Sequence, residues 1–263
     1  MIRSPTITVM TDAVRLAARS LKRDFGEVEQ LQVSVKGPGD FVSAADLRAE
    51  EVLRAALVKA RPGYGLVLEE GGVVEGSDRS HRWHVDPLDG TTNFLHGIPH
   101  CCISVGLERD GQVVAGIVYD FIKDELFIAE RGQGAWMNNR RLRVSARRDP
   151  STFLIATGIP WAGQPGQPRF LKELALAMPR FAGVRRMGVA ALDLAYGAAG
   201  RFEAYWENGV KSYDIAAGII LVREAGGFVT DTAGRDVALD GRSILAGNEA
   251  AHPAMLETLK AAA

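Results

Sequence analysis

Two aspartates stand three positions apart in the stretch WHVDPLDGTTNF, residues 83–94. Residues 83–85 are typical of the end of a buried strand. Because Pro87 has a fixed φ and no N–H for a strand ladder, we expect the strand to stop there. Gly90 permits a tight exit, and Thr91 or Thr92 can cap a helix that begins near Asn93.

This arrangement would bring the carboxylates of Asp86 and Asp89, the carbonyl of Leu88 and free backbone N–H groups to one place. Carboxylate and carbonyl oxygens are the ligands that hard divalent cations prefer, and a helix N-terminus favours an anion such as phosphate. A bare DxxDG would more often be an ordinary turn that caps a helix. The whole stretch at residues 83–94 favours a metal-dependent phosphoryl site instead.

Acidic residues elsewhere are candidates to complete such a site. Glu69 and Glu70 follow a short apolar strand at residues 65–68 and precede two glycines; on their own they would be solvated turn residues. Asp214 falls at the start of an apolar helix, where an acid commonly caps the helix or complements its dipole. Together with the aspartates of residues 83–94, Asp214 is a candidate metal ligand brought in by folding.

The composition is that of an ordinary globular protein. Of 263 residues 47% are hydrophobic, and the formal net charge of −1 gives no overall attraction to nucleic acid or membrane. No apolar run approaches the roughly 18 residues that span a bilayer, and no export signal is visible. The two cysteines, Cys101 and Cys102, are adjacent, so we expect buried, reduced thiols in a cytoplasmic protein, without a metal or redox role.

The N-terminal part predicts two helices followed by an antiparallel meander. Helical spacing predicts a helix over residues 6–30, and Ser43 with Asp46 predicts a capped second helix. The expected apolar faces are Val9, Ala13, Leu16, Ala17, Leu21 and Phe25 in the first helix and Leu47, Val52, Leu53, Ala56 and Leu57 in the second. Residues 36–40 and 76–81 are expected to be loops. The pair Asp110-Gly111 predicts a hairpin between strands at 102–109 and 112–119, with further strands at 125–129 and 134–137.

The C-terminal part predicts alternating strands and helices. Its boundary is expected near residues 148–150, which divides the chain into an N-terminal subdomain, residues 1–148, with the metal and phosphate motif, and a C-terminal subdomain, residues 149–263, with Glu207 and Asp214. Strands are predicted at 153–157, 183–186, 202–207, around 228 and at 243–246, and helices at 169–178, 190–199, 213–225 and 249–259. This alternation favours a layered α/β arrangement.

Several other features have both a structural and a functional interpretation. The arginine-rich run from Arg140 to Arg148 is usually a solvated hairpin face, and binding of nucleic acid or a protein partner is the minor alternative. His84, His96 and His100 lie near the central motif, where packing is favoured over a metal or acid–base role. No Ser-His-Asp pattern, Walker loop or GxGxxG occurs, which argues against covalent serine catalysis and P-loop chemistry.

Taken together, these stretches resemble the inositol monophosphatase family of magnesium-dependent, lithium-sensitive sugar phosphatases. Residues 83–94 match its first signature, W-x-[IV]-D-P-[IL]-D-G-T-x-N-F, and residues 213–218 are similar to its second, W-D-x-A-A-G. The pair Glu69-Glu70 and residues 185–195 and 223–227 also look like the family. Tyr213 replaces the usual tryptophan and Val189 the usual Ser or Thr. The resemblance covers the chain from about residue 35 and implies a layered α/β (α+β) sandwich of the αβαβα type.

The resemblance also implies a site with two Mg²⁺ ions, and a third, weaker ion that shares Glu69. The implied metal ligands are Glu69, Asp86, the Leu88 carbonyl, Asp89 and Asp214, with Asp86 bridging the two ions. Thr91, oriented by Asp46, would help Glu69 to position and deprotonate the attacking water. The implied substrate-binding residues are Asp89, Gly90, Thr91, Ala190, Glu207 and Asp214, and the N–H groups of Gly90 and Thr91 would hold phosphate oxygens. Lys36 matches a family lysine near the site.

The implied activity is hydrolysis of a small polyol or sugar phosphate, with inositol 1-phosphate the leading candidate. Residues 91–94 look more like the inositol-phosphate branch than the nucleotide-bisphosphate branch. Histidinol phosphate, fructose bisphosphate and NADP are alternative substrates. From another class, the alternative is a regulatory protein of the same fold that acts through RNA-polymerase or ribosome-type partners; the presence of every ligand-type residue favours retained catalysis. Relatives are commonly homodimers, so a homodimer without membrane attachment is expected.

Overall fold

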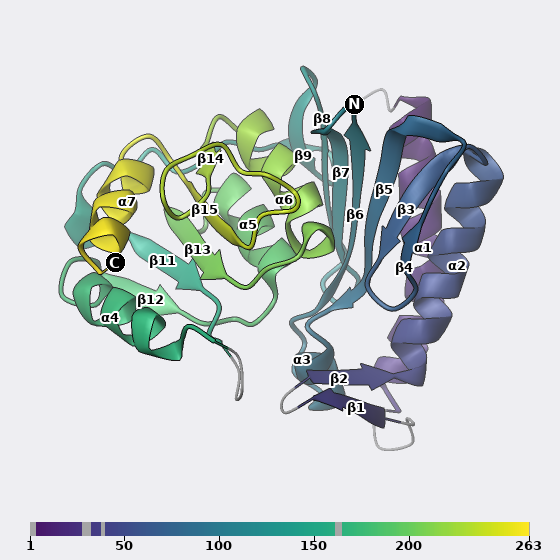
Figure 1. The fold of residues 1–263 in the computed structure, drawn as a ribbon, viewed down its shortest axis with the longest axis horizontal. Coiled ribbons are helices and arrows are strands. Elements are labelled where there is room, and N and C mark those ends of the chain that lie inside the picture. The colour runs from purple at the N-terminus through teal and green to yellow at the C-terminus, as the bar shows by residue number, and fades with distance from the viewer. Residues whose placement is uncertain (1–3, 28–32, 38–39, 161–164, 263) are drawn as a thin grey trace.

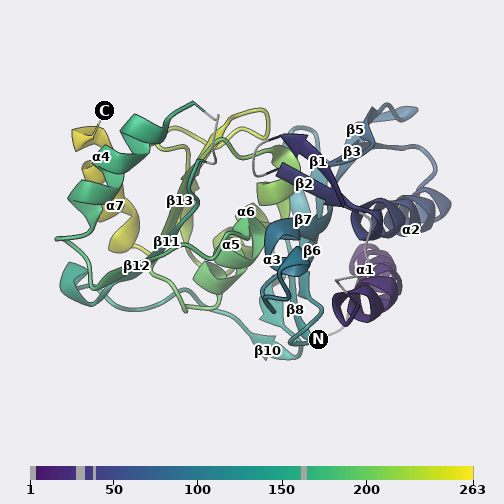
Figure 2. The same ribbon diagram turned by 90° about the horizontal axis from the view of Figure 1, so that it is seen from below.

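Sheets and helices alternate in five layers in the computed structural model, which describes residues 4–27, 33–37, 40–160 and 165–262 (Figure 1). Helices α1 (Pro5–Phe25) and α2 (Ala44–Ala60) cover the outer face of the first sheet, α5 (Ala190–Ala198) and α6 (Ser212–Glu224) lie between the two sheets, and α4 (Gln167–Ala177) and α7 (Ala251–Ala261) cover the outer face of the second (Figure 2). The predicted αβαβα sandwich is therefore confirmed. The structure does not describe the side chains of residues 33–42.

The first sheet contains the predicted meander. Its strand order is β10-β9-β8-β7-β6-β5-β3-β4. The bounds are β3 Tyr64–Leu68, β4 Gly72–Val74, β5 Asp78–Asp89, β6 Cys102–Arg109, β7 Gln112–Asp120, β8 Glu125–Glu130, β9 Gly134–Met137 and β10 Arg140–Arg141. Strands β5 to β9 pair antiparallel, whereas β3 runs parallel to β5. Asp110 (φ 51°) and Gly111 (φ 76°) both adopt positive φ, which is the hairpin turn that Asp-Gly favours.

The second sheet is mixed and alternates with helices along the chain, as predicted. Its order is β12-β11-β13-β15-β14, with β11 parallel to both its neighbours and β15 antiparallel to β13 and β14. The bounds are β11 Leu154–Thr157, β12 Gly183–Arg185, β13 Ala204–Asn208, β14 Phe228–Thr230 and β15 Ser243–Gly247. A separate hairpin is formed by β1 Val33–Gly37 and β2 Asp40–Ser43, so part of the loop expected at 36–40 is strand.

The helices divide the apolar side chains into three clusters. The helices are α1 Pro5–Phe25, α2 Ala44–Ala60, α3 Thr91–Leu95, α4 Gln167–Ala177, α5 Ala190–Ala198, α6 Ser212–Glu224 and α7 Ala251–Ala261, with a 3₁₀ turn at Pro150–Thr152. One cluster lies between α1, α2 and the first sheet, and another between α4, α7 and the second sheet. The largest joins α5 and α6 to both sheets. Because this cluster includes residues from both halves, the division at residue 148 stays a prediction.

The predicted apolar faces of α1 and α2 are each wrong at one exposed leucine. Leu16 in α1 is 47% exposed and Leu47 in α2 is 54% exposed, although both fit a helical period. The buried face of α2 contains the predicted Leu53 and Leu57 together with Ala45 and Ala49, whose small side chains allow α1 and α2 to pack closely. The capping box of Ser43 and Asp46 is confirmed. Helix α1 ends at Phe25, and the expected residues 28–30 lie outside the described part.

The expectations around the central motif need three corrections. Strand β5 begins at Asp78, so most of the expected loop at 76–81 is strand. It also continues through Pro87 instead of stopping there. Helix α3 begins at Thr91, its N-cap is Gly90 at φ 93°, and neither Thr91 nor Thr92 supplies a capping hydrogen bond. The reason is tertiary: pairing with β6 extends β5, and the Thr91 hydroxyl has other partners.

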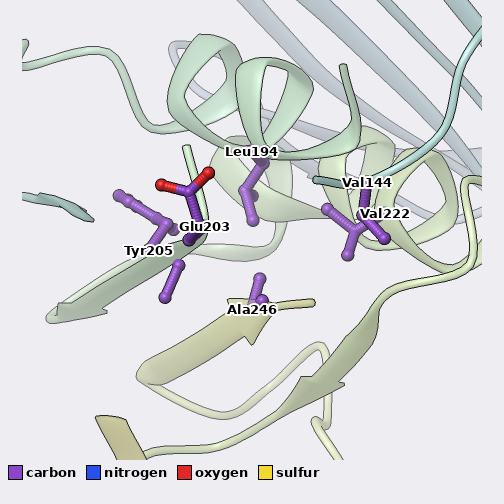
Figure 3. A pocket seen from close by; sticks show the side chains of 9 residues that line it. Val144, Leu194, Glu203, Tyr205, Val222 and Ala246 are labelled. Atoms are coloured by element: carbon purple, nitrogen blue, oxygen red, sulfur yellow. The ribbon is translucent and has the colours of Figure 1, made fainter. Parts of the chain in front are cut away.

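A small cavity of about 10 Å³ lies between α5, α6 and the second sheet, lined by Leu194, Val222 and Ala246 among others (Figure 3). None of the predicted site residues lines it. Gly197 in α5 also lines this cavity, and a Cβ built there would meet no atom within 4 Å.

Gly197→Ala is expected to stabilise the protein by about 0.5–1 kcal/mol, because alanine restricts the unfolded chain and has the higher helix propensity. Differential scanning fluorimetry should show a rise in Tm of about 2–3 °C. The matched control is Gly200→Ala. Gly200 has φ 70°, and its added Cβ would lie 3.1 Å from Arg143 O, so this variant should lower the Tm. Equal effects of the two substitutions would contradict the argument.

Candidate active site

Asp86 and Asp89 lie on either side of an irregularity in β5. Asp86 pairs with Ser104 and Asp89 with Cys102, so three steps along β5 match two along β6. The extra residue is a β-bulge, and Pro87, which has no N–H to donate, lies within it. Residues three apart in a regular strand point to opposite faces. Because directly paired residues share a face, the bulge brings both aspartates to the same face of the sheet.

Two further acids reach this face from other elements. Glu69 follows β3, and its backbone N–H donates to Val85 O at 3.2 Å, which fixes the turn beside β5. Asp214 lies in the first turn of α6 and accepts the N–H of Lys211 at 2.7 Å. Asp86 interacts with both: it shares a side-chain hydrogen bond with Glu69 and is repelled by the charge of Asp214. The predicted convergence of these acids is therefore seen in the fold.

Burial and mutual repulsion disfavour the ionised forms of these acids. Burial first, and then the charge of Glu69, raises the pKa of Asp86 well above its usual value. Burial also raises the pKa of Asp89 to about 8, and burial with repulsion from Asp89 raises that of Asp214. In the described part of the chain no Lys, Arg or His lies within ion-pair distance of these three aspartates.

The oxygen-rich donor set fits a hard divalent cation, which would neutralise the buried charge. No group of three or more His, Cys, Asp or Glu side chains with metal-ligand spacing is found among the described residues.

Thr91 and Asp46 form the predicted pair. Thr91 Oγ1 lies 2.9 Å from Asp46 Oδ1 and 3.1 Å from the Leu88 carbonyl oxygen. Asp46 is fully buried, and its other oxygen accepts the backbone N–H of Ser43 at 2.9 Å. Since a threonine hydroxyl has one proton, it can donate to only one of its two acceptors. When it donates to Asp46, the Leu88 carbonyl is free to bind another group.

Glu207 and Ala190 approach the same acids from the second half of the chain. Asp89 Oδ2 accepts the N–H of Ala191 at 2.7 Å, which places Ala190, the first residue of α5, beside it. Glu207, in β13, contributes to the raised pKa of Asp89 after burial and other nearby groups, and it accepts a hydrogen bond from the hydroxyl of Tyr205. The structure thus brings together the predicted metal and substrate residues.

The comparison with protein families agrees with this geometry. A family model described as "Inositol monophosphatase family" matches residues 3–263. The chain belongs to the inositol monophosphatase family.

Known members of the family match almost the whole chain. The inositol-1-monophosphatase of Mesorhizobium japonicum is 55% identical over 260 residues, covering 99% of this chain and 98% of that protein. The Nus factor SuhB of Escherichia coli K12 is 39% identical over 257 residues, covering 97% and 96%. The structure of the extragenic suppressor protein suhB from Bartonella henselae has a TM-score of 0.94 at 52% identity, covering 98% of this chain and 99% of that chain. The inositol monophosphatase structure from Anabaena has a TM-score of 0.86 at 34% identity, covering 97% and 94%.

Asp193 and Arg186 are two site neighbours to which the family resemblance gave no role, although both lie in the family-like stretch at residues 185–195. Both carboxylate oxygens of Asp193, in α5, are buried without a hydrogen-bond partner among the described residues. Burial and the charge of Glu207 raise the pKa of Asp193 well above its usual value. The exposed Arg186 partly opposes the rise in pKa of Glu207 and Asp193. An acid within the apolar run AALDLA was the available signal for Asp193.

In this inositol monophosphatase fold both cysteines are buried, whereas the histidines near the central motif differ in their exposure. Cys101 and Cys102 are free and buried, as predicted. His100 is buried, and desolvation lowers its pKa to about 4, whereas His96 is exposed at the end of α3. His84 is buried between two polar partners. Lys36 lies in β1, and its side chain is outside the described residues.

Gly158 supports the carboxylate of Glu207, and the sequence motifs gave no sign of this. A Cβ built on Gly158 would lie 1.9 Å from Glu207 Cδ. Gly158→Ala is therefore expected to displace Glu207 and raise KM for the phosphate substrate about tenfold, the cost of about 1.4 kcal/mol of lost binding. Steady-state kinetics checks this. Gly241→Ala, whose Cβ would approach only Ala238 in the same turn, at 2.9 Å from its carbonyl oxygen, is the control and should leave KM unchanged. An unchanged KM in Gly158→Ala would contradict the assignment.

Proposed function

We propose that this protein is a Mg²⁺-dependent phosphomonoesterase that hydrolyses a small polyol phosphate, with inositol 1-phosphate as the substrate. The observation that carries the proposal is the convergence of the buried Asp86 with the partly buried Asp89 and Asp214 beside Glu69, with no cationic side chain at ion-pair distance from the three aspartates in the described residues. Buried carboxylates are stable as ions only when they are paired or bind a metal. Inositol-1-monophosphatases at 53–55% identity support the same activity.

The proposed ligands divide into two overlapping sets. Glu69, Asp86 and the Leu88 carbonyl would hold one Mg²⁺, and Asp86, Asp89 and Asp214 a second, with a third, weaker ion sharing Glu69. The donors are all oxygen, as Mg²⁺ requires. When bound, Mg²⁺ supplies positive charge that stabilises the transferring phosphoryl group and acidifies water.

The remaining residues orient the reactants. Thr91 donates its hydroxyl proton to Asp46, which leaves its oxygen lone pairs to position the attacking water near Glu69. Glu69 accepts the proton from that water. The backbone N–H groups of Gly90 and Thr91 hold phosphate oxygens. Phosphate-ester hydrolysis is very slow in water, so positioning and charge stabilisation supply most of the rate enhancement.

A polyhydroxylated substrate fits the side chains around the acids. Ala190 and the carboxylates of Asp89, Glu207 and Asp214 face the proposed polyol, and carboxylates accept hydrogen bonds from hydroxyl groups. The hydroxyl of Tyr205 fixes Glu207 in this role.

We also propose that the protein is a cytoplasmic homodimer. No helix in the described ranges is long and apolar enough to cross a membrane.

The direct test measures phosphate release from a panel of substrates. Inositol 1-phosphate, histidinol phosphate, fructose 1,6-bisphosphate and NADP are each assayed with Mg²⁺, with EDTA, and with Mg²⁺ plus Li⁺. We expect the highest kcat/KM with inositol 1-phosphate, loss of activity in EDTA and inhibition by Li⁺. Activity that persists in EDTA, or a strong preference for NADP, would contradict the proposal.

A second candidate function is a regulatory role through transcription or ribosome-type partners. It is favoured by relatives at 37–40% identity that are named Nus factor SuhB. Arg147 and Arg148 in the arginine run already pair with Glu203 and Glu249, so the charges that the run offers to a partner are those of the exposed Arg140, Arg141 and Arg143. Pull-down of RNA polymerase with wild-type protein and Asp86→Asn separates the two roles, because a binding role should survive the loss of phosphate release.

A further inference from the structure

His84 connects two polar side chains from distant parts of the chain. Its Nδ1 lies 2.9 Å from Ser212 Oγ, and its Nε2 lies 2.8 Å from Glu108 Oε2. The imidazole is only 3% exposed, so water does not compete strongly for either contact. A carboxylate only accepts hydrogen bonds, so Nε2 carries a proton toward Glu108. In the neutral ring Nδ1 is then the acceptor, and Ser212 donates to it.

The sheet register places His84 under the N-terminus of α6. His84 pairs with Gly106 in β6, and Gly106 pairs with Gly116 in β7. A Cβ on Gly106 would lie 2.6 Å from the Cβ of Ala216, so α6 lies directly on these strands at their glycines. Glu108 is two residues beyond Gly106 and therefore shares its face. Among the paired residues His84, Gly106 and Gly116, only His84 has a side chain, and its imidazole reaches Ser212, the first residue of α6.

The two bonded residues occupy matching positions relative to the acids. His84 precedes Asp86 by two residues, and Ser212 precedes Asp214 by two residues. The hydrogen bond between them therefore joins β5 and α6 immediately before the two carboxylates. A second link lies alongside, because the hydroxyl of Ser104 donates to the carbonyl of Tyr213 at 3.2 Å.

We propose that His84, held by Glu108, is a positioning residue that fixes the N-terminus of α6 against β5, so that Asp86 and Asp214 can bind one divalent cation. This proposal rests on the proposed function of the acids. The charge of Asp214 disfavours ionisation of Asp86, so carboxylates ionised at both positions would push α6 away from β5. The bond from Ser212 to His84 opposes that displacement and preorganises the ligands.

The test compares Mg²⁺ affinity, measured from Mg²⁺-dependent thermal stabilisation and from Tb³⁺ luminescence, in the full-length protein. His84→Asn retains an acceptor near the position of Nδ1, and His84→Gln retains only the donor to Glu108. We expect His84→Gln and Ser212→Ala each to weaken Mg²⁺ binding about tenfold, the lower end of the range for hydrogen bonds outside the ligand set. His84→Asn should stay close to wild type, and Ser212→Ala combined with His84→Gln should be no weaker than either alone.

His252→Ala is the matched control. His252, in α7, is also buried and has its Nε2 3.0 Å from the hydroxyl of Thr230, far along the chain from the acids. This variant should lose Tm without a change in Mg²⁺ affinity. If the His84 variants do not fold, Ser212→Ala alone decides, since it removes only a hydroxyl.

The outcomes separate the two proposals. If the wild-type protein shows no Mg²⁺-dependent stabilisation, the proposed function fails. If wild type binds Mg²⁺ but Ser212→Ala and His84→Gln bind it equally well, the positioning role alone fails. A hydroxyl, an imidazole and a carboxylate in series also occur in serine nucleophile sites. Labelling of wild type by a fluorophosphonate, abolished in Ser212→Ala, would likewise overturn the positioning role.

Discussion

Asp86→Asn is expected to reduce phosphate release by about 10³-fold or more, because Asp86 is the proposed ligand shared by both metal ions. The same substitution should raise the Tm of the metal-free protein. Burial and repulsion from Glu69 disfavour the ionised carboxylate, and an amide removes that charge. The Asn Oδ1 can still accept the N–H of Leu88, which Asp86 accepts at 3.0 Å. Steady-state kinetics and scanning fluorimetry in EDTA measure the two effects.

Asp120→Asn is the matched control for this prediction. Asp120 is equally buried, but it pairs with Lys123 Nζ at 2.7 Å and accepts the N–H groups of Ile122 and Lys123. Removing its charge leaves that cation without its partner, so the Tm should fall. Mg²⁺ stabilisation should be unchanged. A lower Tm in metal-free Asp86→Asn, or full activity of that variant, would contradict the assignment of Asp86.

The Tm of the metal-free protein is expected to fall as pH rises from 7 to 9. The pKa of Asp89 is raised to about 8 by burial, so the folded state binds more protons than the unfolded state up to that pH. Unfolding free energy therefore decreases with pH in this window. Asp89 alone contributes about 1.4 kcal/mol between pH 7 and 9, or roughly 3–5 °C in Tm. Asp86 and Asp214, whose pKa values are also raised, add to it.

Millimolar Mg²⁺ should remove most of this slope, because bound carboxylates stay ionised in the folded state. The measurement is Tm against pH in EDTA and in Mg²⁺. Burial also raises the pKa of the Cys101 and Cys102 thiols, which lowers Tm near pH 9 whether or not Mg²⁺ is present. The difference between the two curves therefore isolates the acids. Asp89→Asn should flatten the EDTA curve, and a Mg²⁺ effect that does not grow with pH would count against the metal site.

Local signals predicted the elements well where a short-range interaction determines them. The Asp110-Gly111 turn and the capping box of Ser43 and Asp46 each depend on neighbouring residues, and both are present. The helix faces were less certain. Leu16 and Leu47 have the right period, but which side of a helix is buried depends on the helix it packs against.

The errors at the central motif have a tertiary origin. Pro87 remains within β5 because pairing with β6 tolerates a bulge there, and that bulge turns Asp86 and Asp89 to one face. Thr91 is not a helix cap because buried Asp46, 45 residues earlier in the chain, takes its hydroxyl. These partners are distant in sequence, so no local pattern indicates them.

The sequence by itself determined the residue types of the site, its family resemblance and the alternation of strands and helices. Their spacing carries that information because metal ligation and phosphate binding need particular donors on particular elements. Only the tertiary structure decided which acids share one environment, how Gly158 makes room for Glu207, and that His84 joins Ser212 to Glu108. These contacts are made between elements far apart in the chain, where sheet register and close helix packing set the distances.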